Sequence, residues 1–234
     1  MTVFVRLCIG FSLVIACYPA CARADTVYVP GPRIEIPSIS PQAFAAISAR
    51  REATRFVRRE DGPRYVIYGA RAKTPPFPSE LTAARGRSYI DGFAQVAPAM
   101  HCRTDDVADA YEFLFQAALL AYNGTRFTSN VPGPAIACRI QSFGATSLDN
   151  VVHIYLGGTP AFARLSDRQK QAVYETLIVV GGYLLENVAR AKPGSREMIV
   201  AKADAAGVVR TLTGFRASRI HLTESGVSID DQAR

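Results

Sequence analysis

The stretch SDRQKQAVYETLIVVGGYLLENVAR, residues 166–190, decides the fold of this chain. Ser166 and Gln169 have the spacing of a capping box, in which two side chains satisfy N–H groups at the start of a helix. Apolar residues then recur on nearly every side of the predicted helix, from Val173 to Val188. A helix that is apolar nearly all round belongs in the centre of a protein. We therefore expect this helix to form the core of a mainly α domain.

The same stretch lacks the length of a membrane span. Glu175 and Glu186 bracket an apolar run of about ten residues, whereas a helix needs roughly 20 to cross the hydrocarbon of a bilayer. Gly181 and Gly182 lie inside the run, where they would let a neighbouring element approach closely. We expect a core helix, and no transmembrane segment in the mature chain.

Helical spacing of apolar residues recurs on both sides of the core helix. Further helices are predicted over about 79–100, 104–122, 135–143, 148–156 and 195–212. Thr104 can cap the second of these helices, and Gly124 and Gly214 have the positions of left-handed C-terminal caps. The sequence thus predicts a compact bundle of about five helices over residues 79–227, followed by a tail at 228–234.

The first 24 residues have the layout of a secretion signal. Arg6 precedes an apolar run over 7–16, and small residues follow up to Ala24, where we expect cleavage. The stretch ending at Cys17 also resembles a lipoprotein box, in which the cysteine is lipidated and the chain stays tethered. Both interpretations predict an exported protein, either periplasmic or secreted.

Residues 25–78 form a predicted linker or extension that is rich in proline and arginine. Proline disfavours helix in its neighbours, so we expect only a short helix from Pro41 to about Arg59 and a strand at 65–68. From residue 25 to 87 the chain has 11 basic and 6 acidic residues, and the remainder is balanced. This segment predicts either weak contact with an anionic partner or a solvated tether.

Two cysteines remain once the leader is removed. Cys8, Cys17 and Cys21 lie in the predicted signal, which leaves Cys102 and Cys138 in the mature chain. An even pair in an exported protein is more often a disulfide than two free thiols. We therefore predict a disulfide bond between Cys102 and Cys138.

Three carboxylates of the second predicted helix share one face. Asp105, Asp109 and Glu112 are spaced i, i+4 and i+7, and His101 precedes them. Such a group could bind a hard cation or supply an acid–base pair. Acidic residues at a helix start also stabilise the helix dipole or form a solvated side. We assign no catalytic, cofactor-binding or metal-binding residue, and keep these four as a candidate polar cluster.

Other signatures of enzymes and of nucleic-acid binding are missing from the sequence. The three histidines have no His-Glu-x-x-His spacing, and only one glycine of a nucleophile elbow accompanies Ser142. No phosphate-binding glycine loop occurs, and the chain has no tryptophan. Aromatic residues do not alternate with the basic residues of the domain, so the stacking surface that single-stranded nucleic acids need is lacking. We predict no cofactor and no specific nucleic-acid partner.

Three motifs carry a resemblance to a known family. They are DDVADAY at 105–111, FxxLSDxQKQ at 162–171 and LTESG at 222–226. Their order and separation resemble an uncharacterised family of exported bacterial proteins, domain of unknown function family 6683, over about 80–227. The resemblance implies a helical domain with a leader and a variable linker. It supplies no activity, no catalytic residue and no partner for the two cysteines.

These observations favour a non-enzymatic binding module that contacts a protein or a cell-envelope partner. Two alternatives remain open. The first is an envelope enzyme of unrecognised type that uses Asp105, Asp109, Glu112 and His101, and the second is a periplasmic immunity or inhibitor protein. The enzyme hypothesis predicts that these four side chains converge in one cavity.

Overall fold

The computed structural model describes residues 47–64, 81, 83–125, 136–138, 148–223 and 226–229. These residues are mainly helical, which confirms the predicted fold class. The predicted leader with Cys17 and the predicted strand at 65–68 lie outside the described residues.

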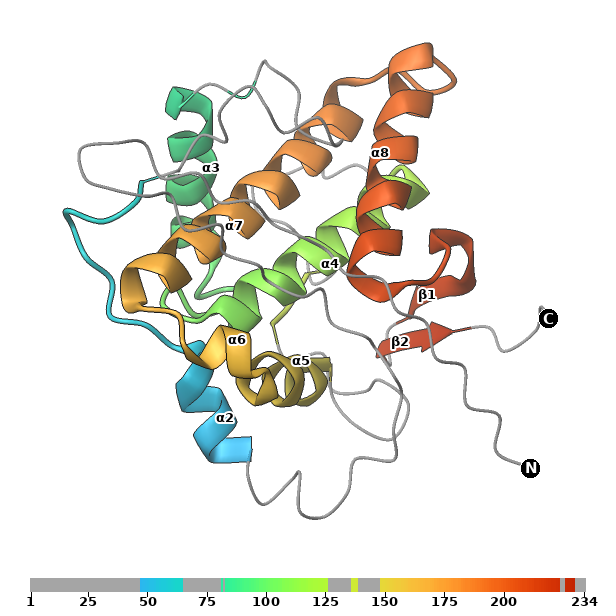
Figure 1. Cartoon of the computed structure of the whole chain (residues 1–234). Coiled ribbons are helices and arrows are strands. Elements are labelled where there is room, and N and C mark those ends of the chain that lie inside the picture. The colour runs from blue at the N-terminus through green and yellow to red at the C-terminus, as the bar shows by residue number, and fades with distance from the viewer. Residues whose placement is uncertain are drawn as a thin grey trace, which may run out of the picture.

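Helix α7, Asp167–Arg190, runs through the middle of the molecule (Figure 1). It packs against α4 (Val107–Asn123), α3 (Ala83–Val96) and α8 (Arg196–Thr213). Its residues stay apolar on several sides because neighbouring helices cover most of its surface. The predicted core helix is therefore confirmed, with the capping box of its first turn formed as expected.

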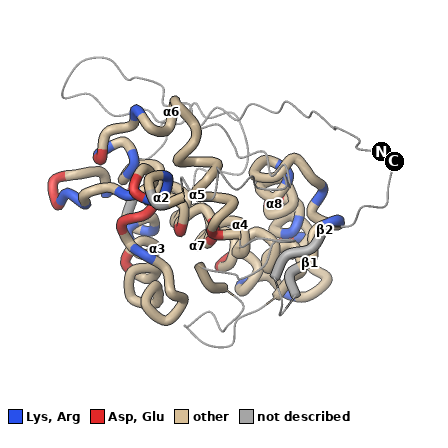
Figure 2. The backbone as a smooth tube through the Cα atoms, turned by 90° about the horizontal axis from the view of Figure 1, so that it is seen from below, with Lys and Arg blue, Asp and Glu red and all other residues tan. Residues whose placement is uncertain are grey.

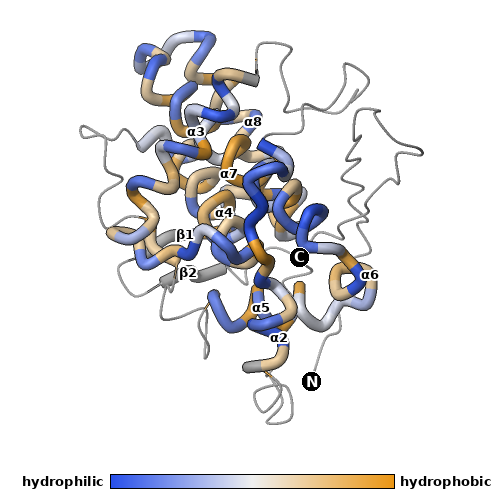
Figure 3. The backbone as a smooth tube through the Cα atoms, turned by 90° about the vertical axis from the view of Figure 1, so that its left-hand side faces the viewer, coloured by the Kyte–Doolittle hydropathy of each residue, from blue (hydrophilic) through white to orange (hydrophobic). Residues whose placement is uncertain are grey.

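The position of α7 matters because its length and composition alone would allow it to cross a membrane. In the structure, 72% of its most apolar 18-residue window is buried inside the protein. Val173, Ile178 and Val188 are fully enclosed. Figure 3 shows hydrophobic stretches of α7 within the body of the molecule.

The glycine pair of α7 allows two aromatic rings to pack against its backbone. A Cβ atom at Gly181 would lie 2.5 Å from Cε1 of Phe113 on α4, and one at Gly182 would lie 2.7 Å from Cδ1 of Tyr89 on α3. Distances this short do not occur between real side chains, so both positions require glycine in this packing. The predicted close approach at these glycines is confirmed.

Helix α4 begins at Val107, later than the predicted start at residue 104. Asp106, not Thr104, is its N-cap, and the Asp106 carboxylate accepts a hydrogen bond from the backbone N of Ala108 at 2.9 Å. Its predicted end is confirmed, because Gly124 has a left-handed φ of 74°. Gly214 ends α8 in the same way, with φ 76°.

Three short helices lie together at one end of the molecule (Figure 1). They are α2 (Ile47–Thr54), α5 (Leu148–Gly158) and α6 (Pro160–Ala163). Helix α2 ends before the predicted end at Arg59, because Arg55 leaves it to form an isolated β-bridge with Asp106. The chain then continues along α7, where Phe56 is buried against Tyr174 with ring centroids 5.4 Å apart.

Two local predictions need correction. The predicted helix over 135–143 is wrong at the residues described there, since Ile136, Ala137 and Cys138 are not helical. The chain also ends in an antiparallel hairpin that was not predicted, formed by β1 (Ile220–Thr223) and β2 (Gly226–Ile229) after a short 3-10 turn, η1 (Ala217–Arg219). The predicted domain end at 227 falls inside β2.

Candidate functional site

Five ionisable side chains converge between α4 and α5, and we call them the acid–histidine cluster. Its members are Asp106, Asp109, Glu112, Asp149 and His153. Asp106 caps α4 and the next two lie on its first turns, while Asp149 and His153 are spaced i, i+4 on α5. All five are buried, which is rare for ionisable groups unless they are paired with one another.

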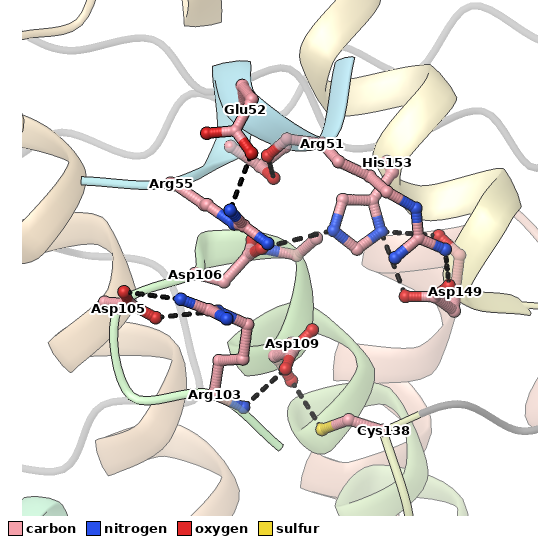
Figure 4. A network of polar contacts seen from close by, with 12 residues as sticks. Arg51, Glu52, Arg55, Arg103, Asp105, Asp106, Asp109, Cys138, Asp149 and His153 are labelled. Carbon is pink, nitrogen blue, oxygen red and sulfur yellow. Dashed lines mark hydrogen bonds and ion pairs between the residues drawn. The ribbon is translucent and has the colours of Figure 1, made fainter. Parts of the chain in front are cut away.

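His153 is held between two carboxylates (Figure 4). Its Nε2 lies 3.2 Å from Oδ2 of Asp106, and its Nδ1 lies 2.8 Å from the backbone oxygen and 3.1 Å from Oδ1 of Asp149. Burial lowers the pKa of His153, but the hydrogen bonds to Asp106 and Asp149 outweigh it and raise the pKa to about 10. The ring is therefore an imidazolium at neutral pH, and it joins α5 to α4.

Arg51 of α2 continues this chain of opposite charges towards the surface. Its Nη2 donates to Oδ2 of Asp149 and, at 2.9 Å, to Oδ1 of Asn150. Burial raises the pKa of Asp149, but the hydrogen bond from His153 and the charges of His153 and Arg51 hold it below its usual value. Charges thus alternate in sign from Asp106 through His153 and Asp149 to Arg51, whose side chain is 34% exposed.

Asp109 lies on the other side of the cluster, where the effect of burial on its pKa outweighs that of its hydrogen bond. It accepts a hydrogen bond from the backbone N of Arg103 at 2.5 Å. Burial raises the pKa of Asp109 to about 6. The negative charge of Asp106 also raises it, while the hydrogen bond from Arg103 lowers it. Asp109 therefore changes its protonation state close to neutral pH.

The predicted polar residues fall into two groups. Asp109 and Glu112 belong to the cluster, but Asp105 lies before α4 and pairs with Arg103 on the rim at 2.8 Å. His101 is exposed, with a φ of 55°, and takes no part. The predicted face that included Asp105 is wrong because the helix starts at Val107.

Sequence reasoning missed Asp106, Asp149 and His153. Two signals were present: the Asp149-x-x-x-His153 spacing, which places both side chains on one face of a helix, and an aspartate three residues before Asp109. Neither signal could show that two helices separated by 24 residues of chain turn these faces towards each other.

By residue type the cluster could hold a cation. Oxygen and nitrogen atoms of Asp106, Asp109 and His153 lie within 4.8 Å of one another, and so do those of Glu112, Asp149 and His153. However, both ring nitrogens of His153 already bond to oxygen atoms, and the imidazolium would have to lose a proton to become a ligand. The geometry fits a buried ion network better than a metal centre.

Acid–base catalysis would need contact between the cluster and a substrate. The side chain of His153 is only 2% exposed, and packed helices enclose the carboxylates beside it. A general base must come within hydrogen-bond distance of the proton that it removes. In the arrangement described, the cluster joins α2, α4 and α5 and offers no such approach.

A disulfide anchors the chain beside the cluster. The structure supports the predicted pair, because the Sγ atoms of Cys102 and Cys138 lie at bonding distance and the Cα atoms 4.8 Å apart. Gln116 of α4 bonds to both the backbone N and O of Ala137 at 3.0 Å. Cys138 also places its Sγ 3.3 Å from the backbone oxygen of Asp109 (Figure 4).

A second feature lies at the surface, where the chain after α2 crosses the start of α7. Arg58, Arg59, Glu60, Arg64 and Gln171 line a hollow of about 450 Å³, which we call the arginine hollow. Gln171 is buried beneath it, accepts from the backbone N of Arg59 at 3.0 Å and donates to the backbone O of Pro63 at 3.2 Å. Figure 2 shows that charged residues of both signs gather on this side, around α2 and α3.

The comparisons with known proteins bear on the helical domain. A family model described as "Family of unknown function (DUF6683)" matches residues 72–230. Searches of curated proteins and of solved structures found no match. The matched range contains the whole acid–histidine cluster and leaves out α2 with Arg51. Because the match covers more than half of the chain, this protein belongs to the DUF6683 family.

Proposed function

We propose that this protein is exported and acts as a non-enzymatic binding protein that contacts an anionic partner through the arginine hollow. Export is supported by the signal layout of residues 1–24 and by the pairing of Cys102 with Cys138, since disulfides persist in oxidising compartments. The partner class follows from the chemistry of the hollow.

The arginine hollow is the observation that carries this proposal. Its lining includes three arginines and one glutamate, Glu60, so basic residues predominate, and an arginine can bind an oxyanion through two parallel hydrogen bonds. Among the described residues, Arg58 makes no ion pair. Arg59 pairs with Asp61 and Arg64 pairs with Asp91, but more than half of each of these side chains is exposed.

Exposed ion pairs contribute only about 0–1 kcal/mol, so an incoming anion can replace Asp61 or Asp91 at little cost. The backbone that carries the arginines is held in place, because buried Gln171 bonds to it at Arg59 and Pro63. A site whose backbone is already ordered loses less entropy when it binds. The acid–histidine cluster, by contrast, is enclosed, which favours binding over turnover as the role of the domain.

The binding proposal is tested with paired arginine variants. The purified protein and its Arg58→Gln/Arg64→Gln variant are passed over vesicles of phosphatidylglycerol and of phosphatidylcholine, and over immobilised acidic peptide. We expect salt-sensitive retention on an anionic surface, reduced at least about tenfold in the variant because two bidentate contacts are lost. Arg196→Gln, an exposed change on α8, is the control. Equal retention of the double variant and the control would refute the hollow as the contact.

Export is tested separately by cell fractionation and N-terminal sequencing. The proposal expects a periplasmic or secreted protein that begins near residue 25. Membrane retention that is lost in Cys17→Ala would show the lipoprotein form instead. A full-length cytoplasmic protein would contradict export in either form.

A further inference from the structure

Helix α2 occupies a site on the family domain although it lies outside the matched residues. The match starts at residue 72, and α2 covers Ile47–Thr54. It packs against α5, whose last two residues are Gly157 and Gly158 (Figure 1). A segment from outside the domain therefore completes one face of it.

The two glycines that end α5 lie against Arg50 of α2, Gly157 against its backbone and Gly158 against its side chain. A Cβ atom at Gly157 would lie 2.8 Å from Cα of Arg50, and one at Gly158 would lie 2.8 Å from its Nη1. The Cβ at Gly157 would clash with backbone atoms, so this position requires glycine in this packing, whereas the atom met at Gly158 is the end of a flexible side chain that can move. The three nearest atoms that a Cβ would meet at each of the two positions belong to Arg50.

The same face of α5 binds two consecutive arginines. Arg50 donates from Nη1 to the backbone oxygen of Ile154 at 2.8 Å, near the C-terminal end of α5, where the helix dipole favours positive charge. Arg51 binds the carboxylate of Asp149 and the amide oxygen of Asn150. All of these groups on α5 are hydrogen-bond acceptors, and they are positioned to bind two neighbouring guanidinium groups.

Among the described helices and strands, α5 makes the main contact with helix α2. It has eight residues, fewer than the roughly 12–15 that an isolated helix needs to be stable in water. Of its described side chains only Thr54 is buried. The segment after it is fixed independently, because Phe56 donates its backbone N to the backbone O of Asp105 and Lys170 donates to the backbone O of Arg55. The chain from residue 55 therefore has contacts of its own, separate from those that hold α2 on α5.

We propose that this face of α5, formed by Asp149, Asn150, Ile154, Gly157 and Gly158, is a receptor site for a short basic helix with two adjacent arginines. In this structure α2 fills the site from within the chain. When α2 leaves, Asp149 and the acid–histidine cluster behind it become open to a competing helix of the same chemistry. The proposal does not depend on the arginine hollow, whose arginines lie in the separately fixed segment.

The first test measures hydrogen exchange of the purified protein. Gly157→Ala should speed exchange of the α2 amides at least about tenfold, because the added Cβ clashes with the backbone of Arg50, and should leave the α7 amides unchanged. Gly207→Ala is the matched control, since nothing lies within 4 Å of a Cβ there. Unchanged exchange of α2 in Gly157→Ala would show that the glycine pair does not hold it.

The second test supplies the helix from outside. A fluorescent peptide of residues 45–56 is titrated into the wild-type protein and into Arg51→Glu, whose own α2 is repelled by Asp149. We expect at least about tenfold tighter binding to the variant, because the tethered α2 no longer competes at its high effective concentration. The same peptide with Arg50→Glu and Arg51→Glu should not bind, and Gly157→Leu introduced into the Arg51→Glu protein should abolish binding.

Two results would overturn the proposal. One is equal binding of the peptide to the wild-type and Arg51→Glu proteins, and the other is binding that survives Gly157→Leu. If Arg51→Glu does not fold, Arg51→Ala empties the site without adding charge and the same comparison is made. Loss of anion binding at the arginine hollow would leave both outcomes unaffected, so the two proposals fail separately.

Discussion

His153 of α5 lies with its Nε2 atom 3.2 Å from Oδ2 of Asp106, the N-cap of α4. The same carboxylate also accepts from the backbone N of Ala108 at 2.9 Å, so one aspartate both starts a helix and binds the imidazolium of another. The contact is fully buried, where attraction between opposite charges is strong but an unpaired charge is costly. The position of α5 on the domain therefore depends on this pair.

His153→Asn should destabilise the protein strongly. The change leaves Asp106 and Asp149 buried without their shared cation, and breaking a buried pair in this way costs about 3–5 kcal/mol. The free energy of unfolding is measured by urea denaturation at pH 7. His101→Asn is the matched control, because this residue is exposed and asparagine tolerates its positive φ. If the two variants lost the same stability, the buried pair would not support the fold.

The pH dependence of stability should report the same contact. The pKa of His153 is raised in the folded protein to about 10 from an ordinary value of 6.5. Its contribution to stability is therefore complete below about pH 6.5 and is lost as the pH rises through 10. Urea unfolding of the wild-type protein between pH 6.5 and 10 should show falling stability, and His153→Asn should flatten that fall. An equal fall in stability in both proteins would show that His153 is not the group responsible.

Asp109 should show the opposite pattern to a paired surface carboxylate. Burial raises its pKa to about 6, so in the folded protein its ionised form is disfavoured, and the stability that it contributes below pH 3.8 is lost as the pH rises through 6. Asp109→Asn removes that penalty, about 3 kcal/mol for a shift of roughly two units, and keeps an oxygen for the backbone N of Arg103.

The stability of the Asp109→Asn variant relative to the wild-type protein should therefore increase between pH 4 and pH 8. Thermal melting across that range makes the measurement. Asp105→Asn, on the rim, controls for the loss of one negative charge. A difference between Asp109→Asn and wild type that stays constant with pH would show that Asp109 does not titrate in this range.

Packing at the core glycines gives a prediction that does not involve charge. Gly181→Ala would place a Cβ 2.5 Å from the ring of Phe113, and overpacking of this kind typically costs about 1–3 kcal/mol. Gly92→Ala, in α3 with nothing within 4 Å, should instead stabilise by about 0.5–1 kcal/mol, because alanine favours helix over glycine. Urea unfolding of the two variants should move in opposite directions, and equal shifts would contradict the packing described.

The parts of this fold that follow from local chemistry could be predicted from the sequence. The capping box at Ser166 and Gln169, the apolar surface of α7 and the glycines that end α4 and α8 each act within a few residues. The start of α4 was misplaced because both Thr104 and Asp106 can cap a helix. The choice of Asp106 depends on His153 and Arg55, which come from distant segments.

Only part of the candidate site could be predicted, because the rest of it comes from distant segments of the chain. Asp109 and Glu112 stand out along one helix, but their partners Asp149 and His153 come from α5. The docking of α2 was not predicted, since its eight residues have a helical preference too weak to form alone and the face that they bind is built elsewhere. Sites that lie between elements depend on tertiary packing, which periodicity and capping patterns do not encode.

The disulfide between Cys102 and Cys138 closes a loop of 36 residues that contains the whole of α4. In the chain-entropy model, a loop of this length stabilises the folded state by about 3–4 kcal/mol. Cys102→Ala/Cys138→Ala should lower the free energy of unfolding by about that amount, and reduction of the wild-type protein should reproduce the loss. The double variant should still fold at 25 °C, because Gln116 continues to hold Ala137 by two hydrogen bonds and the helical core is untouched. Urea unfolding with and without dithiothreitol makes the measurement, with the double variant as the control for effects of the reductant. If the reductant left the wild-type protein unchanged while the double variant was destabilised, the loss would come from packing at the two positions and not from the cross-link.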